Sequence, residues 1–274
     1  MSVIVGFLVA AVIGLILVQV LCRKGGISLD RHPWLLEEAA KLHVHILGGL
    51  AGFAFTGVVL IVTFAQERGG STDPSLDTVV VMFLVAFLWW IGGAFLISFH
   101  PHKEASGDLV PRIHFSLATT LEYRTVFLSW FALPPLLNAN GLGRLEPTIG
   151  FLLLVSMACG SVLVAMIADG LGLIRVRETY LSALVAMILT LTFALVARIA
   201  RLDTGSDYWS LHMALVIFVI NGIGFALASA SPLAPRYAAV RSFFERHGRR
   251  IVVADMQLTM LSLSFLCFSV LGFF

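Results

Sequence analysis

The feature that most constrains the fold is a series of long apolar runs, each close to the length that crosses a membrane. A spanning helix needs about 20 mostly apolar residues, and eight runs in the 274-residue chain meet this requirement: 2–22, 42–65, 78–99, 113–137, 148–170, 179–199, 210–230 and 251–273. Backbone groups inside a bilayer must satisfy one another, so such runs form helices. The chain is 12% charged, whereas soluble domains carry about 25% charged residues. The sequence therefore predicts an all-α polytopic membrane protein with about eight transmembrane helices.

Short similarities between the two halves of the chain favour an internal duplication. The end of the second run, Leu60–Ala65 (LIVTFA), resembles the end of the sixth, Leu189–Ala194 (LTLTFA). The third and seventh runs both pass through glycine-rich centres to a proline. Each match alone is no better than chance, but the matches occur in the same order. We therefore predict one membrane domain made of two four-helix halves, 1–140 and 148–274, which are parallel because four is an even number.

Lysine and arginine are distributed unevenly over the predicted loops, and this bias orients a membrane protein. With the N-terminus outside, the inner loops hold thirteen basic residues and the outer loops four, and Arg124 remains inside a run. This predicts an integral protein of the bacterial inner membrane with both termini on the periplasmic side. Two inner loops, after Pro33 and after Pro235, are amphipathic, and the second places Arg236, Arg241 and Arg246 within reach of anionic lipid headgroups. We interpret them as interfacial helices; solvated connectors are the alternative.

The fourth run stands out because it carries charges near its middle. It reads RIHFSLATTLEYRTVFLSWFALPPLL from Arg112 and contains Glu122 and Arg124. Charged side chains at membrane depth are costly, so they usually face a bundle interior and pair there. Two residues apart on a helix, these side chains point about 200° away from each other, so each is expected to meet a different neighbour. The functional interpretation is a proton or solute site; the alternatives are a structural polar contact and an arginine that reaches the inner surface.

Further polar residues inside the runs extend this candidate site. Asn221 lies in the middle of the seventh run, and Asp255 and Gln257 lie in the first half of the eighth. Under the duplication, Asp255 and Glu122 occupy equivalent helices, and two acids beside a central axis suit a cation or proton path. We therefore predict Glu122, Arg124, Asn221, Asp255 and Gln257 as transport or pore residues.

Histidines form a second candidate site on the predicted inner side. The motifs His43-x-His45 and His100-Pro-His102, together with His114, are candidate metal or haem ligands because imidazole is the commonest metal ligand. A helical His-x-His directs its two rings apart, so structural roles and pH sensing compete with this interpretation. The three cysteines form no CxxC pair, so a thiolate zinc site is not expected. The sequence leaves the cofactor unknown.

The leading functional hypothesis is a membrane conduit, either an ion or proton channel or a small-solute transporter. One alternative is a membrane enzyme or redox protein that binds metal or haem through the inner histidines. A second alternative is a scaffold or assembly subunit of a larger membrane complex, and a homo-oligomer is compatible with all three. A net charge of +2 is too small to favour nucleic acid, and no Walker or dinucleotide fingerprint is present. Whether the protein is an enzyme is left open by the sequence.

Overall fold

The computed structural model describes residues 34–67, 74–99, 109–174, 209–234 and 236–271. These residues form helices and no strand, so the all-α prediction is confirmed for this part of the chain. The elements are α2 (Trp34–Glu67), α3 (Pro74–Phe99), α4 (Leu109–Trp130), α5 (Leu133–Ala139), η1 (Gly143–Leu145), α6 (Glu146–Gly170), α8 (Trp209–Ala230), η2 (Ser231–Leu233) and α9 (Ala238–Leu271).

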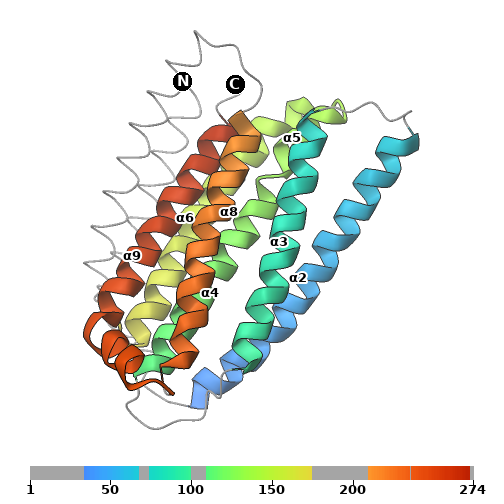
Figure 1. The fold of residues 1–274 in the computed structure, drawn as a ribbon. Coiled ribbons are helices and arrows are strands. Elements are labelled where there is room, and N and C mark those ends of the chain that lie inside the picture. Colours follow the sequence, from blue (N-terminus) through green and yellow to red (C-terminus); the bar gives the residue numbers. More distant parts are fainter. Residues whose placement is uncertain (1–33, 68–73, 100–108, 175–208, 235, 272–274) are drawn as a thin grey trace.

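The long helices run alternately up and down an elongated bundle (Figure 1). α2, α4 and α9 begin at the end where α3, α6 and α8 finish. Two hydrogen bonds tie this end together, from Arg112 Nη1 to the Leu171 carbonyl and from Ser231 Oγ to the Val110 carbonyl, both at 3.4 Å. We call it the basic end. Its described basic residues are Lys41, Arg112, Arg236, Arg241, Arg246, Arg249 and Arg250.

The described helices agree with a membrane protein in length, composition and exposure. Three segments, Leu36–Gln66, Leu76–Ser98 and Leu215–Leu233, are long and apolar enough to cross a membrane. They leave many large apolar side chains exposed, among them Phe53 and Leu88, which suits contact with lipid. The full count of eight spans and the duplication stay predictions, because the runs 2–22 and 179–199 lie outside the described residues.

The fourth run differs from the predicted single helix 113–137. α4 begins at Leu109 and ends at Trp130, and the short α5 follows after a turn. Pro134 and Pro135 explain the break, because a proline lacks the N–H that continues the helix and its ring clashes with the carbonyl four residues earlier. The earlier start keeps Glu122 and Arg124 inside the helix rather than at its end.

The two predicted interfacial helices are also different from expectation. The segment after Pro33 forms the first turns of α2, and the segment after residue 235 forms the first turns of α9, with no break before the apolar part. Each of these helices has 34 residues. At about 1.5 Å per residue each helix is about 51 Å long, which exceeds a hydrocarbon core of about 30 Å. Both helices therefore project beyond the apolar layer if they cross it.

The centre of the bundle is α4. It packs against α3, α6, α8 and α9 along its length and meets α2 over a shorter stretch, and sixteen of its 22 residues are buried. Seven of these buried residues are polar or charged: His114, Ser116, Thr119, Thr120, Arg124, Thr125 and Ser129. The described part of the protein thus places its polar helix inside and its apolar helices outside, the arrangement that a lipid surrounding favours.

Candidate functional site

Several hydroxyl groups of α4 bond back to the helix itself. Thr119 Oγ1 donates to the Phe115 carbonyl at 2.8 Å, and Ser129 Oγ donates to the Val126 carbonyl at 2.8 Å. Threonine and serine commonly bond back to the preceding turn in this way. These hydrogen bonds therefore lower the free-energy cost of burying polar side chains on α4. We do not assign a functional site to them.

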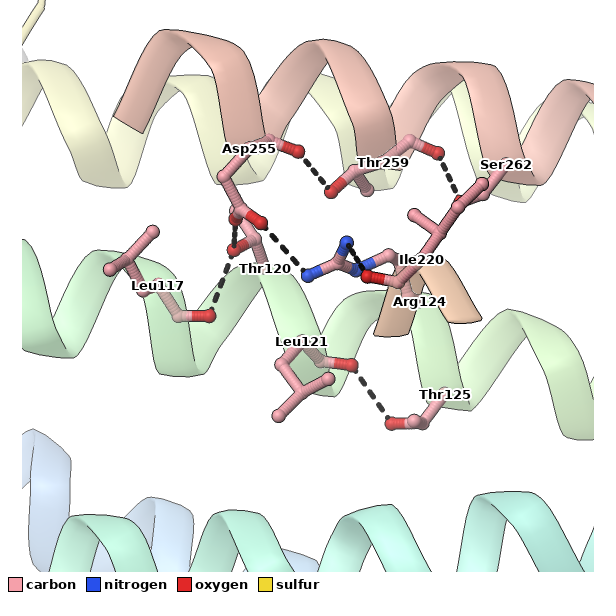
Figure 2. Close-up of polar contacts among 9 residues, drawn as sticks. All are labelled: Leu117, Thr120, Leu121, Arg124, Thr125, Ile220, Asp255, Thr259 and Ser262. Carbon is pink, nitrogen blue, oxygen red and sulfur yellow. Dashed lines mark hydrogen bonds and ion pairs between the residues drawn. The ribbon is translucent and has the colours of Figure 1, made fainter. Parts of the chain in front are cut away.

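Arg124 and Asp255 form a sealed ion pair between α4 and α9 (Figure 2). Arg124 Nη2 lies 3.0 Å from Asp255 Oδ1, and both side chains are 0% exposed. Thr120, one turn before Arg124, donates its hydroxyl to the second carboxylate oxygen of Asp255. The carboxylate of Asp255 is thus engaged through both oxygens, and the pair is neutral as a whole. Hydrogen bonds between charged groups are the stronger kind, so this network joins α4 firmly to α9.

The third helix beside this network is α8. It approaches Arg124 of α4 closely because it carries a glycine, Gly224, at the point of contact. A Cβ atom added at Gly224 would lie 2.0 Å from Arg124 Nη2, which is too close for any side chain. The Arg124 Nη1 group reaches the Ile220 carbonyl at 3.5 Å on the same helix. Gly224 therefore makes the room that the guanidinium occupies.

Asn221 lies on the same buried face of α8 as Gly224, three residues away. Its side chain is 0% exposed. Among the described residues, the Asn221 amide has no hydrogen-bond partner, and neither has Arg124 Nε. An unsatisfied buried polar group costs about 1–3 kcal/mol. This interface between α4 and α8 therefore retains hydrogen-bonding capacity next to the ion pair.

Glu122 meets a different partner on the other side of α4, as its angular separation from Arg124 predicts. Glu122 Oε2 lies 3.2 Å from His43 Nε2 on α2, and the two side chains are 14% and 20% exposed respectively. His43 Nδ1 lies 2.8 Å from the Ala39 carbonyl, and its ring stands edge-on to Phe115 at 5.3 Å between centroids. Unlike the sealed pair of Arg124 and Asp255, this pair is partly accessible.

The contacts of His43 determine which ring nitrogen faces Glu122. A carbonyl oxygen only accepts hydrogen bonds, so Nδ1 of His43 carries a hydrogen and Nε2 faces the carboxyl group. Oε2 of Glu122 lies at ion-pair distance from Nε2 but has no hydrogen-bond partner among the described residues, so a favourable contact needs one proton on one of the two atoms. It resides either on the imidazole, giving a charged pair, or on the carboxyl group, giving a neutral one. The arrangement is suited chemically to gaining and losing one proton.

The other predicted residues are not brought into these two centres. Gln257 is exposed on α9, because it follows Asp255 by two residues and so faces away from it. His45 is exposed and faces away from His43, and His114 is fully buried on α4. His100 and His102 lie outside the described residues. No group of three possible metal ligands occurs within the described part of the chain.

Sequence reasoning missed Thr120 and Gly224. Thr120 precedes Arg124 by four residues, so the two share one face of α4, and that spacing was a usable signal. Gly224 gave no such signal, because its role depends on a side chain 100 residues earlier in the chain. Comparison with known proteins found no matching protein family, no similar curated protein and no similar solved structure. The function is therefore inferred from the geometry of the two centres.

Proposed function

We propose that this protein is a membrane conduit for protons, in which the His43–Glu122 pair takes up and releases the proton. The observation that carries the proposal is the placement of Glu122 Oε2 at 3.2 Å from a histidine nitrogen whose other ring nitrogen is committed to a carbonyl. With one proton between them the two groups are neutral as a pair, so the proton-loaded state leaves no isolated charge at membrane depth, which would be costly. Release of the proton leaves one negative charge on Glu122, beside the imidazole at ion-pair distance. A proton channel and a proton-coupled transporter of a small solute would both use it.

The two acids inside the bundle, Glu122 and Asp255, are given different roles in this proposal. Asp255 is neutralised by Arg124 and bonded by Thr120, so it is poorly placed to bind a passing cation. We assign it, together with Arg124, to holding α4 against α9. Glu122 faces a titratable partner instead. Among the described residues, His43 is the charged or titratable group that lies within ion-pair distance of Glu122.

The position of the His43–Glu122 pair in the bundle also favours proton exchange. The pair lies where α2, at the edge of the bundle, meets α4 (Figure 1), and both side chains retain some exposure. α2 and α4 both begin at the basic end, and we propose that this end faces the cytoplasm because arginine and lysine are in excess there. The proton would therefore enter or leave between α2 and α4. The Asn221 amide and Arg124 Nε, which have no hydrogen-bond partner among the described residues, are candidates for a polar continuation through the bundle interior.

The test is proton flux into liposomes that contain the purified protein, driven by an imposed potassium diffusion potential. Glu122→Gln keeps the shape of the side chain and removes its titratable group, so flux should fall to the rate of protein-free liposomes while the fold is retained. His43→Gln should also lose flux. Glu38→Gln and His45→Gln are the matched controls, because Glu38 and His45 are exposed on α2; both should conduct as the wild type does. Unchanged flux in Glu122→Gln would rule out Glu122 as the proton carrier.

A further inference from the structure

A second feature, independent of the conduit, is the outward face of the first turns of α9. Arg246, Arg249 and Arg250 are all exposed there, and Phe243 on the same side is 49% exposed. The spacing of three and four residues between Phe243, Arg246 and Arg250 places them in one stripe along the helix. Arg249 lies beside this stripe. We call these four residues the α9 basic face.

The opposite side of the same turns fixes the direction of this face. Phe244, Gly248 and Val252 follow one another at intervals of four and are buried. A Cβ atom added at Gly248 would lie 2.2 Å from Ile113 Cδ1 on α4, so α9 lies very close to α4 at this point. This close packing prevents α9 from rotating and holds the α9 basic face away from the bundle.

The charges of this face are not balanced by neighbouring acids. Arg241, one turn earlier, is paired with Glu245 at 2.8 Å. Arg246 Nε donates to the Ser242 carbonyl at 3.1 Å. Among the described residues, no acidic side chain lies within ion-pair distance of Arg246, Arg249 or Arg250. Three guanidinium groups within two turns therefore remain available to an anion.

The surroundings point to a lipid anion rather than a free one. Phe243 is exposed within the α9 basic face, and Leu233 and Tyr237 nearby are 46% and 58% exposed. Exposed apolar and aromatic side chains beside arginines are typical of a helix surface at the membrane interface, with the rings among the acyl chains and the charges at the headgroups. Guanidinium groups bind phosphate oxygens in a bidentate manner.

We propose that the α9 basic face binds the headgroups of anionic phospholipids in the leaflet at the basic end of the bundle. The phosphodiester would lie against Arg246, Arg249 and Arg250, and an acyl chain would lie along Phe243. The length of α9 agrees with this position, because its 34 residues are more than an apolar layer of about 30 Å can cover.

Binding is tested by native mass spectrometry of the full-length protein in detergent, titrated with phosphatidylglycerol or with phosphatidylcholine. The triple variant Arg246→Gln/Arg249→Gln/Arg250→Gln should lose affinity for phosphatidylglycerol on the order of 100-fold, about fivefold for each arginine near the surface. Its affinity for phosphatidylcholine should not change. The double variant Arg241→Gln/Glu245→Gln is the matched control, because it removes both charges of a neutral pair on the same helix, and it should bind as the wild type does.

Three results would overturn the proposal. Wild-type affinity for phosphatidylglycerol in the triple variant would show that the α9 basic face does not bind the lipid. An equal loss in Arg241→Gln/Glu245→Gln would show that the effect is not specific to this face. Full competition by inorganic phosphate at the concentration of the lipid would assign the face to a free anion instead. If the triple variant does not fold, Arg250→Gln alone should still weaken binding, and added salt should weaken phosphatidylglycerol binding to the wild type.

Discussion

Breaking the Arg124–Asp255 pair from one side is expected to destabilise the protein strongly. In Asp255→Leu the guanidinium of Arg124 keeps its charge, because arginine is protonated at any practical pH, and both side chains are fully buried. Removing one partner of a buried pair costs about 3–5 kcal/mol. Each kcal/mol corresponds to about 2–4 °C in the unfolding temperature of a chain of about this size, so Tm should fall by about 6–20 °C.

Removing both charges should restore most of this loss. In the double variant Arg124→Met/Asp255→Leu no charge remains buried, and apolar replacements of buried ion pairs are often neutral or stabilising by about 1–4 kcal/mol. Arg124→Met alone should lie between the two, because an unpaired Asp255 can take up a proton whereas an unpaired Arg124 cannot release one. A larger fall in Tm for Asp255→Leu than for Arg124→Met is therefore the result expected specifically of a fully buried ion pair.

The assay is thermal unfolding of the detergent-solubilised protein, followed by tryptophan fluorescence and by circular dichroism. Glu245→Gln serves as the control, because it breaks the pair with Arg241 whose side chains are 49% and 48% exposed. An exposed pair contributes about 0–1 kcal/mol, so Tm should scarcely move. If Asp255→Leu unfolds at the wild-type temperature, or if the double variant is as unstable as that single variant, the buried pair is not what joins α4 to α9.

Two further substitutions test the packing around the pair. Gly224→Ala should lower stability by about 1–3 kcal/mol, because its Cβ would lie 2.0 Å from Arg124 Nη2; Gly222→Ala, with nothing within 4 Å of its added Cβ, should not, and equal effects in a thermal melt would contradict the role of Gly224. Asn221→Leu should leave Tm unchanged or higher, because it removes a buried amide that has no partner among the described residues. A marked fall in its Tm would show that a hydrogen-bond partner holds the amide in place.

The sequence predicted the polar centre of the fold well but not its partners. Glu122 and Arg124 were expected to meet different neighbours because helical geometry separates them, and they do so. The identity of Asp255 as the partner of Arg124 was not predictable, because 131 residues separate the two in the chain. Pairing over such a distance depends on how helices pack, which periodicity within one helix does not report.

Other differences between the predicted and the observed helices arose where a local sequence signal was present but the apolar content of the run was given more weight. The break after Trp130 was encoded by Pro134 and Pro135, yet the apolar run continued past them and favoured one long helix. Conversely, no proline or glycine separates Trp34 from Leu47, so the continuity of α2 was encoded as well. Gly248 interrupts the corresponding part of α9, but its function is close packing on Ile113 rather than a break. A glycine within a helical pattern has both meanings, and only the packing partner decides between them.

The most direct test of the proposed function is proton entry into liposomes that contain the wild-type protein, measured with a trapped pH indicator while a potassium gradient with valinomycin sets the potential. We predict acidification of the interior at a rate that scales with the amount of protein, that persists when sodium is replaced by choline, and that disappears in Glu122→Gln. Liposomes with wild-type protein that acidify no faster than protein-free liposomes, across the pH range and with either sign of the potential, would contradict a proton conduit.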